Sequence, residues 1–301
     1  MTSAVPSSAP APAMLCRLAS LLTRRYPFLS GCGSLADASA LRALTGSGVV
    51  CTRLPTGEQI LVRADDYIGR AVLLFGDLDP KISAILRRVL RPGDTVVDVG
   101  ANCGLVALQA ARLVGPRGRV HAFEPQADPA SMLTESAFLN GFAHLYVHRT
   151  ALSDHDGRMS LRLDPANSGK ASLSRTEPVA GRTVRVRRAA DALEELRLGP
   201  VRLLKLDVEG HEAEVLDGAA GWLARRPADF VLFESHRQPT PFRRRAAVRI
   251  LAELGYEFRE VRRSLLRLQL APVGRDPDGN DFLAFRRNRA VRPAAPSEQR
   301  S

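Results

Sequence analysis

The apolar segment LLKLDVEGHEAEVLDGA (residues 203–219) is interrupted by charged residues of types that could do chemistry. If the segment begins as a strand, Lys205 and Asp207 lie on the same face, because side chains alternate along a strand. An isolated ion at the end of a covered strand loses hydration, which costs several kcal/mol. Asp207 could orient or deprotonate an acceptor hydroxyl, alone or through His211, while Lys205 balances the negative charge. Glu209 is a second candidate base, or a cap for the following helix.

The same pattern leaves structural alternatives open. Asp207 and Glu209 could form only an ion pair and a helix cap, and His211 could be a surface residue of the first helical turn. His236, at the end of the next expected strand, is a lower-ranked candidate base. Asp207 and Glu209 could also join another carboxylate in holding a divalent metal such as Mg²⁺. The spacing identifies no third ligand, so a metal is not indicated.

A second polar stretch, DVGANCG (residues 98–104), follows another apolar run. Gly100 and Gly104 permit a tight turn from a strand into a helix and the close approach of a ligand to the backbone. Glu124 lies about 20 residues beyond the second glycine, where nucleotide-binding folds carry the acid that binds ribose hydroxyls. The sequence therefore predicts a nucleoside-containing ligand.

The charge of each candidate nucleoside ligand determines whether it is compatible with the carboxylate of Asp98. A dinucleotide site favours a glycine where Asn102 stands, and the carboxylate of Asp98 would repel a pyrophosphate. The ammonium and sulfonium groups of S-adenosylmethionine instead complement Asp98. The phosphate-binding pattern G-x-x-x-x-G-K-[ST] is absent from the sequence. S-adenosylmethionine is therefore the predicted cofactor, and an NAD-dependent Rossmann oxidoreductase is the alternative enzyme.

The elements that must position these residues alternate between strand and helix from Thr95 onward. This alternation predicts right-handed βαβ units and an α/β, Rossmann-like fold with a mostly parallel central sheet flanked by helices. The strands are expected at residues 95–100, 118–125, 143–153, 159–163, 182–188, 203–208, 228–235, 256–262 and 281–286. The helices are expected at residues 79–90, 103–114, 128–141 (with Asp128 as N-cap), 189–198 and 211–224, with an arginine-rich helix after 236. Ligands of such sheets bind beyond the carboxyl ends of the strands, where both polar stretches fall.

Composition limits the other functional classes. The chain has 301 residues, 45% of them hydrophobic, and no apolar run near the roughly 18 residues that span a bilayer. Four scattered cysteines without C-x-x-C spacing, and a start that lacks the pattern of a secretory signal, favour a cytoplasmic protein. The net charge of +11 comes almost entirely from arginine, without an RRM, KH or zinc-finger pattern. Nucleic acid is therefore an unlikely partner, although an arginine-rich RNA-associated binding module remains the noncatalytic alternative.

Several motifs together resemble those of FkbM-type S-adenosylmethionine-dependent methyltransferases, in order and in spacing. The resemblance covers about residues 57–234 and rests on IGRAVLLFGDLDP, VVDVGANCGLVAL, VHAFEPQ, LNG, ALSDHDG, NSGKASL and LLKLDVEGHEAEVLDGA. It implies O-methylation of a small metabolite, a sugar or a glycan. The residues that it implies around the cofactor are Asp98, Gly100, Ala101, Asn102 and Gly104 near the methionine end, Glu124 at the ribose, and Ala151 and Leu152 near the adenine. The chain departs from the usual pattern at Cys103 and His211.

The domain organisation expected from this resemblance has four parts. Residues 1–13 and 289–301 are predicted disordered tails. Residues 14–92 are an N-terminal extension with an amphipathic helix near 14–25 and a hairpin near 49–65, and residues 93–288 form the methyltransferase domain. The polar NSGKAS stretch around Lys170 is expected to be a mobile loop that closes over the acceptor.

Overall fold

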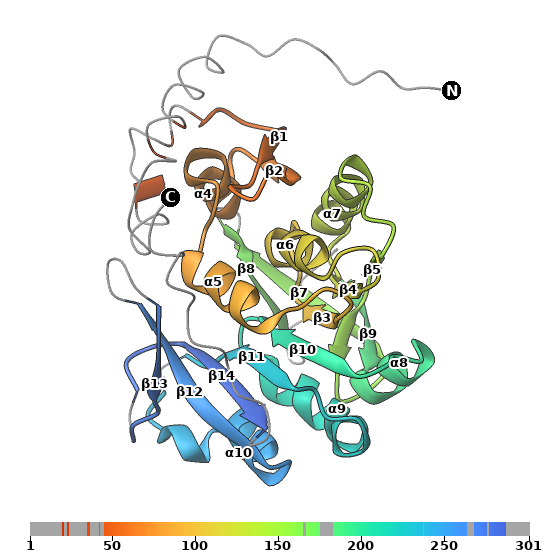
Figure 1. The fold of residues 1–301 in the computed structure, drawn as a ribbon, viewed down its shortest axis with the longest axis vertical. Coiled ribbons are helices and arrows are strands. Elements are labelled where there is room, and N and C mark those ends of the chain that lie inside the picture. The colour runs from red at the N-terminus through yellow and green to blue at the C-terminus, as the bar shows by residue number, and fades with distance from the viewer. Residues whose placement is uncertain are drawn as a thin grey trace.

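A central sheet with helices on both faces forms the core of the protein (Figure 1). The computed structural model describes residues 20, 23, 35, 36, 42, 45–164, 167–174, 183–236, 238–263, 268–275 and 277–286. Most of the helix predicted near residues 14–25, and both predicted tails, lie outside this part of the chain. None of the helices in the described part is both long and apolar enough to cross a membrane.

Eight strands make up the central sheet. Five of them are parallel: β3 (Thr95–Val99), β4 (Arg119–Phe123), β5 (Leu145–His148), β10 (Val201–Leu206) and β11 (Phe230–Glu234). Three more extend it in antiparallel pairing: β12 (Tyr256–Arg263), β13 (Leu268–Pro272) and β14 (Asp281–Arg286). The order is β13-β12-β14-β11-β10-β3-β4-β5, which confirms the predicted Rossmann-like, mostly parallel sheet. Strand β13 was not predicted.

The alternation of apolar side chains along the strands builds two cores, one on each face of the sheet. Val96 and Leu203 pack against α5 (Pro80–Val89), α6 (Leu105–Val114) and α7 (Ala127–Leu139). Val97 and Leu204 face α8 (Ala189–Glu195), α9 (Glu212–Arg225) and α10 (Ala246–Glu253), the last preceded by a 3₁₀ turn at Phe242–Arg244. Burying each such side chain stabilises the fold by about 1.5–3 kcal/mol, so the cores hold the strand ends in place.

Several helix ends differ by up to three residues from the predicted bounds, because α6 begins at Leu105, α7 begins at Ala127 and α8 ends at Glu195. Helix α5 begins as predicted, with Pro80 in its first turn and Asp79 as N-cap, whose Oδ1 accepts from Lys81 N at 3.2 Å. Helix α7 was expected to begin after Asp128, but its N-cap is Gln126. Asp128 instead lies in the first turn, where its carboxylate interacts favourably with the positive end of the helix dipole.

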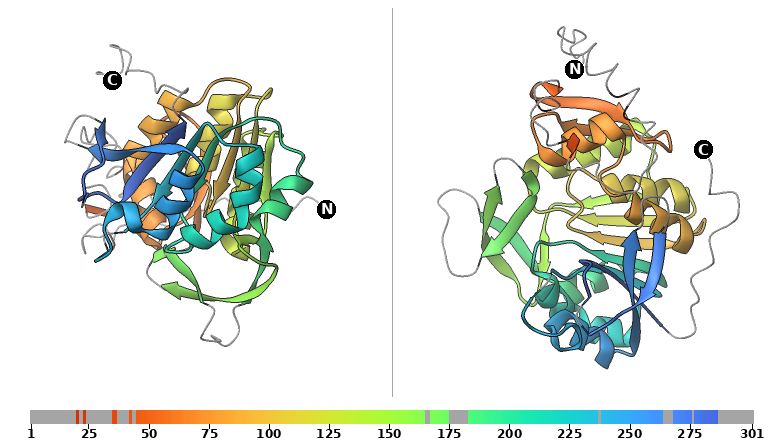
Figure 2. Two further views of the ribbon diagram at one scale, coloured as in Figure 1. Left: turned by 90° about the horizontal axis from the view of Figure 1, so that it is seen from below. Right: turned by 90° about the vertical axis from the view of Figure 1, so that its left-hand side faces the viewer.

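The segment predicted as one strand at 143–153 divides between two sheets. After β5 the chain turns at Thr150, whose N–H donates to His148 O at 2.8 Å. The next residues form β6 (Ala151–Ser153) in a separate sheet with β7 (Gly157–Asp164), β8 (Asn167–Ser174) and β9 (Thr183–Arg188), in the order β6-β9-β7-β8. This sheet projects from the core (Figure 2). Strands β7 and β9, both predicted as strands, are antiparallel.

The NSGKAS stretch is a strand and not the predicted loop. It forms most of β8, which pairs with β7 in antiparallel register. Leu161 of β7 and Leu173 of β8 line the cavity described below, so this hairpin lies beside the site as the prediction placed it. The backbone hydrogen bonds with β7 hold this segment in a strand, which its polar composition does not indicate.

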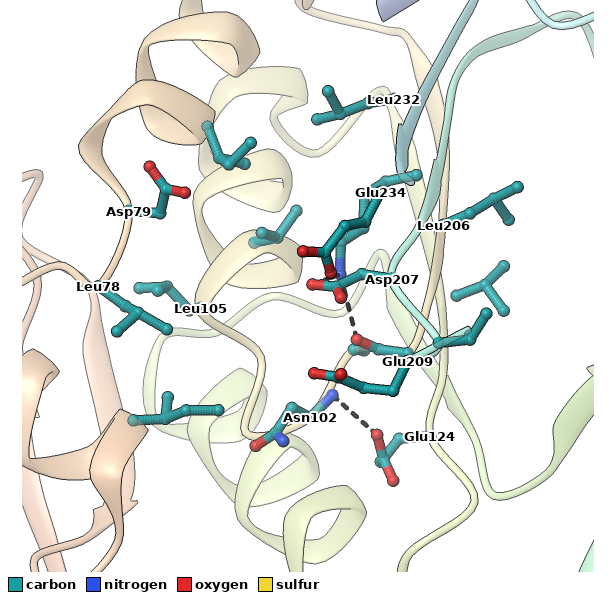
Figure 3. A pocket seen from close by; sticks show the side chains of 18 of the residues that line it. Leu78, Asp79, Asn102, Leu105, Glu124, Leu206, Asp207, Glu209, Leu232 and Glu234 are labelled. Atoms are coloured by element: carbon teal, nitrogen blue, oxygen red, sulfur yellow. Dashed lines mark hydrogen bonds and ion pairs between the residues drawn. The ribbon is translucent and has the colours of Figure 1, made fainter. Parts of the chain in front are cut away.

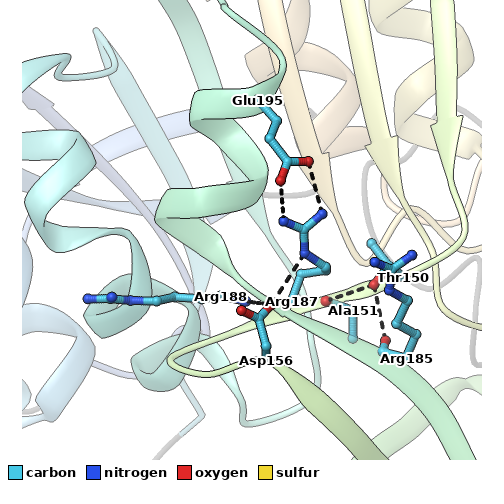
Figure 4. Close-up of polar contacts among 7 residues, drawn as sticks. All are labelled: Thr150, Ala151, Asp156, Arg185, Arg187, Arg188 and Glu195. Carbon is cyan, nitrogen blue, oxygen red and sulfur yellow. Dashed lines mark hydrogen bonds and ion pairs between the residues drawn. The ribbon is translucent and has the colours of Figure 1, made fainter.

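A polar network joins the second sheet to helix α8 (Figure 4). The guanidinium of Arg187 on β9 donates to both carboxylate oxygens of Glu195, at 3.0 and 2.6 Å, and to Asp156 Oδ1 at 3.3 Å. The Thr150 hydroxyl donates to Arg185 O at 3.2 Å. These contacts fix the start of β6, which carries two of the residues expected near the adenine.

The N-terminal extension adds the predicted hairpin and one helix that was not predicted. Strands β1 (Val49–Arg53) and β2 (Gln59–Arg63) pair in antiparallel register. Helix α4 (Tyr67–Phe75) begins at the N-cap Asp66, whose carboxylate accepts from Ile68 N and Gly69 N, and ends at Gly76. The loop that follows leads to α5 and forms one wall of the cavity.

Candidate functional site

A cavity of about 550 Å³ lies beyond the carboxyl ends of β3, β4, β10 and β11 (Figure 3). Ligands of open α/β sheets bind at this position. The remaining walls include the loop between α4 and α5, the first turns of α5 and α6, β6, the β7–β8 hairpin and the start of β14. Both polar stretches of the sequence therefore meet at one cavity, as predicted.

Gly100 allows the turn after β3 to touch the end of β10. Its φ of 79° is in the left-handed region, and a Cβ atom at this position would stand 1.9 Å from the carbonyl oxygen of Asp207. The N–H groups of Gly100 and Ala101 both donate to Phe123 O, at 2.9 and 3.1 Å. A larger residue at position 100 would force the two strand ends apart.

Of the five residues implied near the methionine end, three line the cavity: Gly100, Ala101 and Asn102. Gly104 does not line it. It is the N-cap of α6, and a Cβ there would lie 2.1 Å from Leu133 Cδ1, so its role is to let α6 pack against α7. Asp98 does not line the cavity either, because its side chain is completely buried beneath the turn.

Asp98 acts on the site through Lys205. The Lys205 Nζ atom lies 3.1 Å from Asp98 Oδ1, 3.4 Å from Asp207 Oδ2 and 3.1 Å from Gly100 O, to which it donates. Neither Asp98 oxygen has a hydrogen-bond partner in the described part of the chain, so the ion pair compensates its charge. Burial disfavours the charge of Lys205, but the two carboxylates outweigh it and raise the pKa of the amine.

Glu124 is buried against the turn after β3. Its Oε2 accepts from Asn102 N at 2.9 Å and its Oε1 from Gln126 N at 2.8 Å (Figure 3). Burial raises the pKa of Glu124 to about 7, against the opposing effect of these two N–H groups. Ala151 and Leu152, on β6, line the cavity as well. The residues implied for the ribose and the adenine therefore share one cavity with the glycine turn.

Three carboxylates converge at the ends of β10 and β11. Asp207, Glu209 and Glu234 each offer an oxygen within 4.8 Å of the others (Figure 3). Burial, followed by repulsion from Asp207 and other carboxylates, raises the pKa of Glu234 to about 9. The spacing would suit one cation, but acidic groups at a surface commonly approach this closely without an ion, and Lys205 already contacts Asp207. No metal is assigned to this cluster.

His236 adjoins the same carboxylates. Its Nδ1 lies 3.4 Å from Glu234 Oε1 and its Nε2 lies 4.0 Å from Glu209 Oε2, and its side chain is half exposed. The structure therefore brings this lower-ranked candidate base to the cavity, which it lines.

His211 is turned away from the cavity, contrary to the expectation that it assists Asp207. It is the N-cap of α9, it is buried, and its Nε2 lies 2.8 Å from Ser153 Oγ on β6. Its Nδ1 lies 3.7 Å from Glu214 Oε2. The turn that begins α9 aims the ring at the second sheet, so His211 is a packing residue that joins α9 to β6.

Glu209 does not cap α9, whose N-cap His211 makes no side-chain capping bond, and Glu212 instead binds the turn before the helix. Glu212 Oε1 accepts from Val208 N at 3.1 Å and from Gly210 N at 3.2 Å. Glu209 has a φ of 52° and lines the cavity. The left-handed conformation at Glu209 turns its side chain toward the cavity and leaves the capping of the turn to Glu212.

Sequence reasoning missed the opposite wall of the cavity. Lys81 Nζ lies 2.9 Å from Asp79 Oδ2 and 2.5 Å from Asp281 Oδ2, and it joins α5 to β14. Leu78 adds an apolar surface. Glu234, in the strand expected at residues 228–235, has no role in the sequence analysis. The rarity of lysine in this chain was the one available signal for Lys81.

Comparisons with known proteins agree with this geometry. The model of the methyltransferase FkbM domain matches residues 98–269, which is more than half of the chain. The 31-O-demethyl-FK506 methyltransferase FkbM of Streptomyces tacrolimicus is 32% identical over 203 residues, with 56% of this chain and 76% of that protein covered. The hexuronic acid methyltransferase AglP of Haloferax volcanii is 28% identical over 180 residues, with 60% of this chain and 71% of that protein covered.

Solved structures of methyltransferases are similar at lower identity. A methyltransferase FkbM from Methylobacillus flagellatus is 14% identical with a TM-score of 0.41, covering 73% of this chain and 66% of that chain. The match to the family model, together with the sheet and the cavity at its strand ends, establishes what the chain is. It belongs to the FkbM family of S-adenosylmethionine-dependent methyltransferases.

Proposed function

We propose that this methyltransferase transfers the methyl group to a hydroxyl of a small metabolite or a sugar. The observation that carries the proposal is the juxtaposition of Asp207 and Lys205 with the Gly100 turn in one cavity. A carboxylate beside the reacting centre can orient the acceptor and receive its proton. The names of the two relatives, one for a 31-O-demethyl compound and one for a hexuronic acid, support an oxygen acceptor of this class.

The residues present fit S-adenosylmethionine. Each Glu124 oxygen already accepts one backbone N–H, which leaves a second lone pair on each for the two ribose hydroxyls. Ala151 and Leu152 offer an apolar surface for the adenine. The exposed edge of Asp207, together with Glu209, complements the positive charges of the methionine end. The bound cofactor would supply the electrophilic methyl group.

In this proposal each polar residue of the chain has a distinct task. Asp207 accepts a hydrogen bond from the acceptor hydroxyl and orients its oxygen toward the methyl group. Lys205 fixes Asp207 and the carbonyl of Gly100 at once, so it is a positioning residue. Glu209 and His236 border the acceptor and contribute to its orientation. Holding the reacting atoms in line contributes a large part of the rate in such transfers.

The test uses S-adenosylmethionine with an isotopically labelled methyl group and a panel of sugars and hydroxylated metabolites. Labelled product identified by mass spectrometry as a methyl ether supports the proposal. Asp207→Asn should lower turnover by a factor of about 10²–10⁴, the usual contribution of a positioned acid or base. Asp217→Asn, with the same loss of charge at an exposed position of α9, is the matched control. Label found on nitrogen or carbon of the acceptor would overturn the assignment to oxygen.

A further inference from the structure

The carboxylates at the mouth of the cavity outnumber the basic groups beside them. Lys205 contacts Asp207 from the buried side, where it also neutralises Asp98. The charged groups that face Glu234 are Asp207, Glu209 and Glu212 around the end of β10, Asp281 at the start of β14 with its partner Lys81, and His236 after β11. Glu234 therefore stands among four other carboxylates, and a new negative charge there is unfavourable.

Glu234 holds a proton at neutral pH for this reason. Its burial and the neighbouring carboxylates keep its pKa well above the usual range of a glutamate. Asp207 is held by its ion pair with Lys205. Two acidic side chains of one cavity thus differ in their surroundings: one is fixed by a buried lysine, and the other carries a proton that it can lose.

We propose that Glu234 takes the proton of the acceptor hydroxyl, and that the positive charge of bound S-adenosylmethionine first drives off the proton that Glu234 carries. This inference rests on the proposed function. A positive charge brought into the cavity favours the ionised form of a nearby carboxyl group. Glu234 would therefore become a base only when the methyl donor is present. Because the reacting hydroxyl has a single proton, Asp207, already engaged by Lys205, would orient the acceptor through a neighbouring hydroxyl.

The charges and bonds of this step balance. The acceptor O–H bond breaks and its proton passes to the Glu234 carboxylate. The new O–CH₃ bond forms while the S–CH₃ bond breaks, and the electron pair of that bond remains on sulfur. Glu234 loses its negative charge in the same step that removes the positive charge from the sulfonium. The net charge of the cavity is unchanged, so the surrounding carboxylates do not oppose the reaction.

Proton release on cofactor binding tests the inference without an acceptor. Calorimetric titrations at pH 8 in phosphate, HEPES and Tris, which differ in ionisation enthalpy, give the number of protons released per ligand bound. S-adenosylmethionine should release between about half a proton and one proton. S-adenosylhomocysteine, which lacks the sulfonium charge, should release less than half as much. Glu234→Gln should lose the release, whereas Glu209→Gln, the same change in the same cluster, should keep more than half of it.

The outcomes separate this inference from the proposed function. Circular dichroism and thermal unfolding first establish that each variant is folded. Equal proton release with both ligands, or undiminished release in Glu234→Gln, shows that the inference alone is wrong. If the folded wild-type protein binds neither ligand, the proposed function fails together with it.

Discussion

The Nζ atom of Lys205 lies 3.1 Å from Oδ1 of Asp98, whose side chain is fully buried. This ion pair lies directly under the turn that lines the cavity, and Lys205 also holds Gly100 O and Asp207. The charged residues that interrupt the apolar strand are therefore joined to each other across two neighbouring strands. Their mutual contacts explain how a covered strand end carries both a lysine and a carboxylate.

Lys205→Met should destabilise the protein strongly, because it leaves Asp98 buried without a counter-charge. Removing one partner of a buried ion pair costs about 3–5 kcal/mol. The double variant Lys205→Met/Asp98→Asn should recover part of this loss. Urea unfolding of the two variants and of Asp98→Asn completes a double-mutant cycle. A double variant that is less stable than Lys205→Met would contradict the pairing.

Gly100→Ala should disrupt both the fold of the turn and cofactor binding. The added methyl group would meet Asp207 O at 1.9 Å in a backbone conformation that favours glycine. Overpacking of this kind costs about 1–3 kcal/mol. Gly199→Ala is the matched control, since nothing lies within 4 Å of a Cβ at that position. Thermal unfolding and S-adenosylmethionine titration should affect the first variant and spare the second.

Glu124 should make the stability of the protein depend on pH. Burial raises its pKa to about 7, so the folded protein binds this proton more tightly than the unfolded chain does. The contribution of Glu124 to the unfolding free energy should therefore fall as the pH rises from about 4.5 to about 7, and this contribution should stay constant above that range. Glu124→Gln should show a shallower decrease in urea unfolding at pH 5, 6, 7 and 8. The slope is the readout, because the amide also changes the hydrogen bonds with Asn102 and Gln126. An unchanged slope would show that Glu124 is not the titrating group.

His211→Ala should lower stability and leave the chemistry intact. The imidazole contacts Ser153 Oγ at 2.8 Å inside the protein, and that hydroxyl also donates to Asp154 Oδ1 at 2.9 Å, so the variant loses one hydrogen bond worth about 0.5–1.5 kcal/mol. Because the ring is turned away from the cavity, S-adenosylmethionine affinity should change less than about threefold, under 1 kcal/mol. A folded His211→Ala variant that loses methyl transfer while retaining cofactor binding would restore the role as a base.

The sequence was sufficient to predict the central sheet and the place of the site. Apolar strands alternating with amphipathic helices indicate a parallel sheet, although not the order of its strands, and the sheet brings Gly100, Glu124 and Asp207 to one edge. The N-terminal hairpin was also predicted. These features depend on periodicity and turn residues, which are local properties of a sequence.

The predictions were wrong where contacts between separate segments of the chain determine the direction of a side chain or the pairing of a strand. The direction of His211 depends on a turn that Glu212 caps and on Ser153, 58 residues earlier in the chain. The strand at NSGKAS depends on pairing with β7, which its polar composition does not reveal. Asp98 lines no cavity because its charge is matched by Lys205 on the neighbouring strand. Each of these contacts joins separate segments of the chain, so the local sequence of either segment does not indicate it.

The most direct test of the account is a calorimetric titration of the purified protein with S-adenosylmethionine, with NAD in parallel. The cavity geometry predicts binding of S-adenosylmethionine with a dissociation constant in about the micromolar range, or near −8 kcal/mol, and no binding of NAD. Glu124→Ala should weaken S-adenosylmethionine binding at least about tenfold, or 1.4 kcal/mol, through loss of the contacts with ribose. A folded protein that binds NAD, or that gives no heat with S-adenosylmethionine, would contradict the account.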